Sequence, residues 1–86
     1  MTQANSEIKN LVLDTVSRIL DVDHDELTLK TRPADLLEWD SFANMQIWIE
    51  LTELTQKSID FDEYINCQCL EDLAIIFSSS ALNPKA

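Results

Sequence analysis

Glycine is missing from this chain of 86 residues, although it makes up about 7% of an average protein. Gly-rich phosphate loops and dinucleotide-binding fingerprints need glycine and are therefore excluded. Cysteine occurs only at Cys67 and Cys69. With one residue between them these thiols are poorly spaced for a mutual disulfide, and no second pair is present to complete a zinc site. We expect core or half-buried thiols in a reducing compartment.

Basic residues are also scarce. The chain has 6 Lys and Arg but 16 Asp and Glu, so its formal net charge is -10. Such a chain repels nucleic-acid phosphates and anionic lipid surfaces, so we expect no nucleic-acid partner. The charge is concentrated between Asp35 and Asp72, where ten acidic residues accompany one basic residue, Lys57. Natural partners should therefore carry Lys and Arg.

No apolar run approaches the length that spans a membrane, so membrane insertion is not expected. The segment from Met1 to Ser6 is polar and lacks the apolar core of a signal peptide, which favours a cytoplasmic protein. The length indicates a single domain over 1–86, with a core of about 6–78 and loose ends. A domain this small buries roughly 60% of its unfolded surface, which leaves little room for a deep catalytic cavity.

Apolar residues recur at helical spacing, and no β-hairpin turn signal is present. The pattern predicts long helices near 6–20, 41–56 and 70–78, and a short one near 62–66. The expected fold class is therefore all-α, a small bundle of four helices with a long loop between the first two. The side chains that we expect to be mostly buried are Ile8, Val12, Val16, Ile19, Ile47, Leu51, Leu73 and Phe77.

The connection between the first two long helices runs from Asp21 to Trp39, and Pro33 prevents it from continuing as one helix. A loop this long in a small domain is usually functional or pinned by its own side chains. We expect a short helical turn near 25–27. The apolar residues available as pins are Val22, Leu27, Leu29, Leu36 and Leu37.

The acidic start of this connection suggests a calcium-binding loop beginning at Asp21, but an EF-hand needs Gly at its sixth position and Glu at its twelfth. Those positions hold Glu26 and Arg32, so we expect no metal site. The only histidine, His24, could serve catalysis only if the fold brought it onto Ser41. No oxyanion-hole signature accompanies it. We expect an exposed histidine and a protein that is not an enzyme.

The helix expected near 41–56 is apolar around much of its girth. Asp40 or Ser41 can cap its N-terminus, and Trp39 before them can pin the loop as a hydrophobic staple. Its positive dipole end would stabilise a phosphate on Ser41. One side carries Phe42, Met45, Ile49 and Thr52, and the neighbouring side carries Ile47, Trp48, Leu51 and Leu54. We expect Trp48 in the core; Met45 and Ile49 could complete the core or face a partner.

From Ile8 to Phe77 the chain resembles the freestanding acyl or peptidyl carrier proteins. The segment Leu-Glu-Trp-Asp-Ser-Phe ending at Phe42 corresponds to the family's segment around its phosphopantetheine serine, usually Asp-Ser-Leu. The resemblance implies an acyl-carrier-like four-helix fold. It also implies a covalent 4'-phosphopantetheine, taken from coenzyme A, on Ser41 beside Asp40. This arm would hold acyl, aminoacyl or peptidyl cargo as a thioester.

The sequence also departs from the family pattern. The usual glycine before Asp-Ser is absent, and Phe42 replaces the usual leucine. Gln46 and Thr52 stand where acidic residues are common. These differences favour nonribosomal peptide or polyketide assembly. The alternatives are a fatty-acid-type carrier, or an acidic helical adaptor that binds basic proteins without any prosthetic group.

The resemblance further implies a monomer that is served by other enzymes. These are a phosphopantetheinyl transferase, an adenylating or acyl-loading enzyme, and condensing, tailoring or thioesterase enzymes. An apolar centre with an acidic rim is the usual anatomy of a recognition surface. The residues expected to contact these partners are Glu38, Phe42, Met45, Ile49, Glu50 and Glu53.

Overall fold

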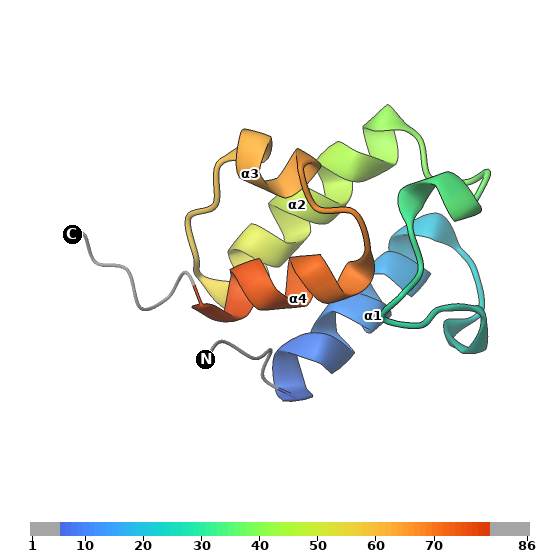
Figure 1. The fold of residues 1–86 in the computed structure, drawn as a ribbon, viewed down its shortest axis with the longest axis horizontal. Coiled ribbons are helices and arrows are strands. Elements are labelled where there is room, and N and C mark those ends of the chain that lie inside the picture. The colour runs from blue at the N-terminus through green and yellow to red at the C-terminus, as the bar shows by residue number, and fades with distance from the viewer. Residues whose placement is uncertain (1–5, 80–86) are drawn as a thin grey trace.

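The computed structural model describes residues 6–79, and the regular secondary structure in this part of the chain is all helical, with no β-strand (Figure 1). The all-α prediction is therefore confirmed, while the expected loose ends lie mainly outside the described residues. The four α-helices are α1 (Ser6–Leu20), α2 (Ser41–Thr55), α3 (Phe61–Ile65) and α4 (Leu70–Ser79). Two 3-10 turns, η1 (His24–Glu26) and η2 (Pro33–Asp35), lie in the long connection.

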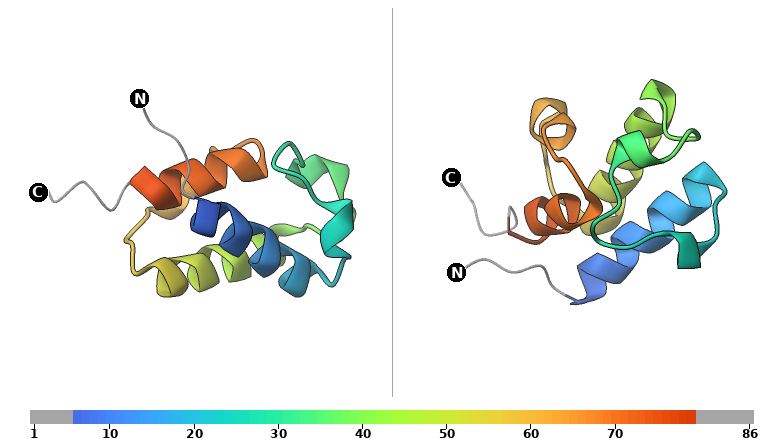
Figure 2. Two further views of the ribbon diagram at one scale, coloured as in Figure 1. Left: turned by 90° about the horizontal axis from the view of Figure 1, so that it is seen from below. Right: turned by 45° about the vertical axis from the view of Figure 1, so that its right-hand side comes forward.

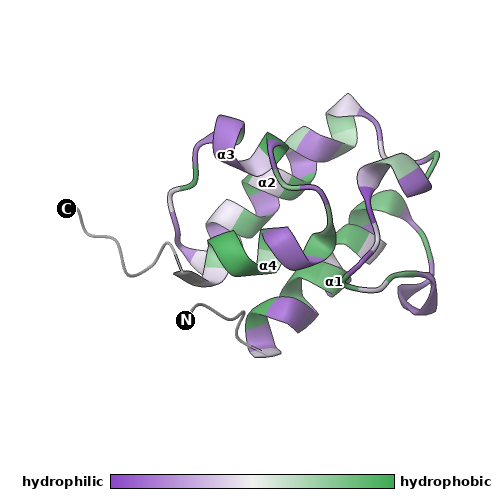
Figure 3. Ribbon diagram, viewed as in Figure 1, coloured by the Kyte–Doolittle hydropathy of each residue, from purple (hydrophilic) through white to green (hydrophobic). Residues whose placement is uncertain are grey.

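The helix α1 lies between α2 and α4 and packs against both, and α2 also contacts α3 and α4 (Figure 2). The hydropathy colouring alternates along α1, as expected for a helix with one buried side (Figure 3). That side is formed by Val12, Thr15, Val16 and Leu20, which are all buried. The exposed side of α1 is joined to α2 by an ion pair, with Arg18 Nη2 3.0 Å from Glu50 Oε2.

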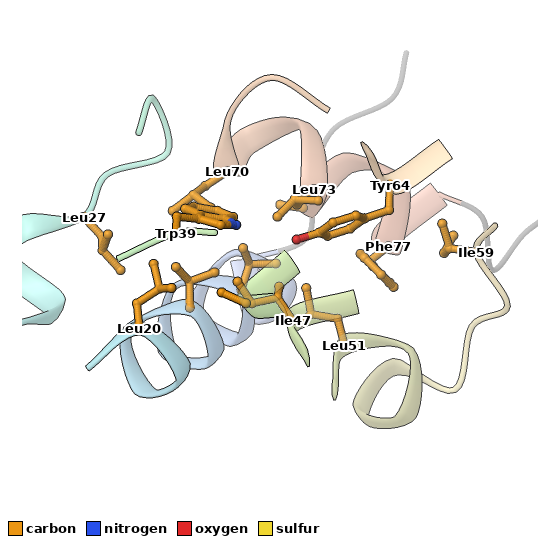
Figure 4. Packing of buried hydrophobic residues seen from close by; sticks show 14 residues of the cluster. Leu20, Leu27, Trp39, Ile47, Leu51, Ile59, Tyr64, Leu70, Leu73 and Phe77 are labelled. Atoms are coloured by element: carbon orange, nitrogen blue, oxygen red, sulfur yellow. The ribbon is translucent and has the colours of Figure 1, made fainter. Parts of the chain in front are cut away.

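The buried side chains form one hydrophobic core to which all four helices and the connection contribute (Figure 4). Of the residues predicted to be buried, Ile8 and Ile19 are only partly buried, because they lie at the two ends of α1 and cover the edge of the core. The other six are buried as predicted. The complete core comprises Val12, Val16, Leu20, Leu27, Trp39, Ala43, Ile47, Leu51, Ile59, Tyr64, Leu70, Leu73, Ala74 and Phe77.

Trp48 was expected in the core, but it is only partly buried at the margin of the core. Its indole Nε1 donates a hydrogen bond to the carbonyl oxygen of Ile59 at 2.7 Å. Its ring meets that of Phe61 edge to face, with the ring centroids 5.1 Å apart. A tryptophan placed at an edge can bury its ring and still satisfy its N–H group. Trp48 therefore closes the turn between α2 and α3.

Two helix ends show how the chain manages without glycine. Asp21 after α1 and Gln56 after α2 adopt the left-handed conformation, with φ of 59° and 60°. Glycine usually fills such C-terminal positions because other residues incur a steric cost there. Ser17 supports the first of these ends, because its hydroxyl donates to the carbonyl oxygen of Val22 at 2.7 Å. The left-handed Gln56 also explains why α2 ends at Thr55 and not at the predicted Gln56.

The long connection is fastened to α4 by its backbone. The amide of Leu70 donates to the Thr31 carbonyl at 3.0 Å, and the amide of Glu71 donates to the Leu29 carbonyl at 2.8 Å. First-turn amides have no partner within their own helix, so the connection satisfies two of them for α4. The expected turn near 25–27 is present as η1, whereas η2 was not predicted.

Among the expected pins, Leu27 is buried, and Val22 and Leu36 pack partly buried against the core. Leu29 is half-buried. Leu37 contradicts the prediction because its side chain is fully exposed. The backbone turns between Leu36 and Trp39, and these two residues take the inward positions.

Thr15 carries a polar group that the core does not satisfy. Its side chain is fully buried and its hydroxyl oxygen has no hydrogen-bond partner. Because an unpaired buried hydroxyl costs about 1–3 kcal/mol, we expect Thr15→Val to raise the free energy of unfolding by about 1–2 kcal/mol in urea titrations. The control is Thr55→Val, which removes a hydroxyl that donates to the Leu51 carbonyl at 2.6 Å. Equal effects of the two substitutions would contradict this explanation.

Candidate functional site

Ser41 is the first residue of α2 and its side chain is exposed. Asp40 caps the helix, because its carboxylate accepts a hydrogen bond from the Ala43 amide at 2.9 Å. The Asp40 carbonyl begins the helical ladder by accepting from the Asn44 amide at 3.0 Å. Of the two caps considered from the sequence, the structure uses Asp40. Ser41 is therefore not needed as a cap, and its hydroxyl lies at the positive end of a helix of 15 residues.

A polar network lies behind this turn. The indole Nε1 of Trp39 donates to Asn44 Oδ1 at 2.6 Å, and the Tyr64 hydroxyl donates to the same oxygen at 3.0 Å. In Figure 4 the nitrogen of Trp39 and the oxygen of Tyr64 point toward one another. Trp39 was expected to act as a hydrophobic staple. Trp39 does link the residue before the cap to the fourth position of the helix, as a staple would. That fourth position is Asn44, however, so the link is a hydrogen bond and not an apolar contact.

The network connects three elements that are far apart in the sequence. Trp39 belongs to the connection, Asn44 to α2, and Tyr64 to the short helix α3. Burial raises the pKa of Tyr64 above its ordinary value, and the nearby Cys67 raises it further. Tyr64 therefore remains a neutral hydrogen-bond donor at physiological pH. The turn that presents Ser41 is held by α3 as well as by its own helix.

A small pocket of about 40 Å³ opens beside this network. It lies between η2, the start of α2 and the segment that joins α3 to α4. Its lining combines apolar, polar and thiol groups from Pro33, Trp39, Asn44, Tyr64, Ile65, Cys67, Cys69 and Leu73. Both cysteines are half-buried free thiols, as expected from the sequence.

Apolar side chains surround Ser41 on the outer surface. Phe42 is 70% exposed, and Met45 and Ile49 along the same side of α2 are 49% and 46% exposed. Leu37 in the connection is also fully exposed. Contiguous exposed apolar side chains are uncommon on a small protein and typically mark an interaction surface. The open question about Met45 and Ile49 is thus answered, because Ala43, Ile47 and Leu51 form the buried side of α2.

The acidic residues assigned to the same surface differ from one another. Glu38, Asp40 and Glu53 are exposed. Glu50 is half-buried and its carboxylate forms the ion pair with Arg18 on α1. Three of these carboxylates are therefore exposed around the apolar side chains, whereas that of Glu50 already has a cationic partner.

The other candidate sites do not assemble at Ser41. His24 Nε2 lies 3.1 Å from Asp14 Oδ1, so the histidine pairs with α1. Arg32, at the position of a calcium-binding glutamate, pairs with Asp35 at 3.5 Å. Within residues 6–79 no group of three or more His, Cys, Asp or Glu side chains has an arrangement that could hold a metal ion.

Sequence reasoning identified Ser41 and Asp40 but missed the residues that support them. Asn44 was not singled out, although an amide four positions after an N-cap is suited to bond the residue before that cap. Tyr64 was recognised only as part of a short helix, and Leu37 was named as a possible pin of the connection. None of these roles has a local signal, because each depends on which elements meet in space.

Comparisons with protein-family models, curated proteins and solved structures found no match to this chain. In the described part of the chain, every helix is too short or too polar to cross a lipid bilayer.

Proposed function

We propose that this protein is a carrier that holds acyl, aminoacyl or peptidyl intermediates as thioesters on a 4'-phosphopantetheine arm attached to Ser41. The observation that carries the proposal is the exposed Ser41 at the first position of α2, capped by Asp40 and surrounded by exposed apolar side chains. The protein itself catalyses no step. Its role is to present the serine and the arm to partner enzymes in nonribosomal peptide or polyketide-type biosynthesis.

The residues present fit such a group. A transferase can reach the Ser41 hydroxyl because it is exposed, and the N-terminal dipole of α2 favours a phosphate there. When bound, the arm would supply a terminal thiol that holds the cargo. Ser41 Oγ would provide the oxygen of the phosphodiester, while Asp40 holds the first turn in place through the Ala43 amide. Delivery would then depend on the high effective concentration of a tethered cargo.

The proposal extends to the fold and the setting. Three long helices, one short helix and a long connection after α1 are what an acyl-carrier-like four-helix bundle requires. Two departures from the family pattern support a specialised pathway over fatty-acid synthesis. Gln46 is an exposed neutral residue, and the Thr52 hydroxyl is buried in the molecule. Neither position therefore presents an acidic side chain for a fatty-acid-synthesis enzyme to recognise. We place the protein in the cytoplasm as a monomer.

The net charge of -10 favours a second candidate, an acidic adaptor that binds basic proteins without a prosthetic group. The two functions are separated by intact mass. The apo protein is incubated with coenzyme A and a broad-specificity phosphopantetheinyl transferase. A gain of a single phosphopantetheine supports the carrier, whereas no gain with a transferase that modifies a known carrier in parallel supports the adaptor.

If basic enzymes dock on the surface around Ser41, changes of charge there should alter the rate of modification. We expect Glu53→Lys to lower kcat/KM for modification about two- to fivefold at low salt, since one exposed ion pair is worth about 0–1 kcal/mol. The difference should shrink at high salt because exposed charges are screened. Met45→Ala should lower kcat/KM by an amount that depends little on salt. Kinetics of transferase modification at two ionic strengths measure both effects.

The matched control is Asp25→Lys, which makes the same charge change on the exposed η1 turn packed against α1. This variant should retain most of the wild-type rate. If it loses as much activity as Glu53→Lys, only the net charge matters and α2 is not the docking surface.

A further inference from the structure

The pocket beside Ser41 holds two thiols that the proposed function does not use. Cys67 and Cys69 line the same pocket as Trp39 and Asn44. Trp39 lies two residues before Ser41, so their Cα atoms are at most about 7 Å apart. Asn44 lies three residues further along α2, which places neighbouring side chains about 5–6 Å apart. The pocket therefore begins within about one helical turn of the serine.

A phosphopantetheine arm on Ser41 would be long enough to bring its terminal thiol to the mouth of this pocket. It consists of a phosphate followed by pantoic acid, β-alanine and cysteamine units, and three extended residues already span roughly 10 Å. Its terminal thiol would therefore meet the pocket thiols at the millimolar effective concentration that a short flexible tether provides.

We propose that Cys69 is a covalent partner of the arm, and that a disulfide between Cys69 Sγ and the arm thiol forms across the pocket when glutathione disulfide is present. This inference rests on the proposed function of Ser41. In the first exchange, one glutathione is displaced from glutathione disulfide by the arm thiol. Cys69 then attacks the arm sulfur as a thiolate and displaces the second glutathione. Two thiols become one disulfide, and one glutathione disulfide becomes two glutathione thiols that take up the two protons.

Geometry selects Cys69 over Cys67. The Cys67 thiol donates to the Glu63 carbonyl, with Sγ 3.7 Å from the oxygen. Burial, together with the nearby Asp72, Cys69 and Glu63, raises the pKa of Cys67 to about 12. Only a thiolate attacks a disulfide at a useful rate, so Cys67 remains a protonated bystander.

A disulfide between the two cysteines themselves is disfavoured by the fixed backbone. The Cys67 amide donates to the Tyr64 carbonyl at 3.0 Å, and the Cys69 carbonyl accepts from the Asp72 amide at 3.1 Å. These bonds hold both residues in place, and a disulfide requires specific Cα separations and side-chain directions. A flexible arm has no such restriction. Because the disulfide would occupy the thiol that takes cargo, an oxidised carrier could not be loaded until it was reduced.

The test uses the full chain carrying the arm, as wild type, Cys69→Ser and Cys67→Ser, each treated with glutathione disulfide. Cleavage by trypsin after Lys57 separates Ser41 from both cysteines, so only a disulfide can join the two peptides. The wild type and Cys67→Ser should lose the mass of two hydrogens and yield the joined peptides, which a reductant separates. Cys69→Ser should yield about tenfold less joined peptide and carry glutathione instead, because its remaining cysteine is held protonated. Far-UV circular dichroism checks that each variant is folded.

Two results would overturn the inference while leaving the carrier function intact. The first is an arm that is attached to Ser41 but only carries glutathione, or a disulfide confined to the peptide that contains both cysteines. The second is as much joined peptide from Cys69→Ser as from the wild type. If the transferase attaches no arm at all, the proposed function is wrong and this inference falls with it.

Discussion

Replacing Ser41 with alanine should abolish the phosphopantetheine mass gain and leave the fold unchanged. The loss is complete because no other side chain supplies a hydroxyl at the first position of α2. The fold should be unaffected because Asp40, not Ser41, accepts the capping hydrogen bond from Ala43. Alanine is also a better helix former than serine, so the free energy of unfolding should change by less than about 0.5 kcal/mol. Intact mass after transferase treatment and thermal unfolding measure the two effects.

Asp40→Ala is the complementary variant. It removes the cap and should cost about 0.5–2 kcal/mol of stability, yet it keeps the hydroxyl that receives the arm. Modification of Asp40→Ala should therefore be slower but still reach completion. A mass gain that persisted in Ser41→Ala would move the modified residue elsewhere, for example to Ser58, and the carrier assignment at Ser41 would have to be withdrawn.

Leu51→Ala should strongly destabilise the protein. Leu51 is fully buried in the core, and the cavity left by removing its side chain should cost about 2–5 kcal/mol. The expected stability of a domain of this size is about 4–13 kcal/mol, so the variant would lose a large share of it. Urea unfolding followed by circular dichroism gives the difference directly.

The matched control is Leu54→Ala, one turn further along the same helix, where the leucine is 49% exposed. Its truncation should cost less than about 1 kcal/mol, because little of the side chain is removed from contact with the core. A cost for Leu51→Ala of less than half a kcal/mol, or equal costs for the two leucines, would mean that the buried side of α2 has been assigned wrongly.

The division of α2 into a buried and an exposed side explains what this helix can do. Ile47 and Leu51 are fully buried in the core, while Met45 and Ile49 remain in contact with solvent. Both pairs are equally apolar in the sequence. The exposed apolar residues on α2 are the ones that a proposed carrier or adaptor would present to a partner. This holds for a carrier and for an adaptor alike, which is why modification of Ser41 is the experiment that separates them.

The sequence by itself determined the helical fold class and the approximate helix limits. Apolar spacing is a local property, and it placed α1 at 6–20 without error and α2 within one residue of its end. The position of Asp40 and Ser41 at the N-terminus of α2 could also be predicted from the local sequence, because capping involves only the first turn of a helix. The charge that favours basic partners required nothing beyond composition.

Only the tertiary structure decided which of several apolar or polar side chains face inward. Leu36 and Leu37 are adjacent leucines, yet one packs against the core and the other is fully exposed. Asn44 accepts from Trp39 and from Tyr64, 20 residues away along the chain, because α3 lies against the start of α2. The pocket that gathers both cysteines near Ser41 has the same origin. Such contacts arise from the packing of distant elements, and local spacing carries no information about which elements will meet.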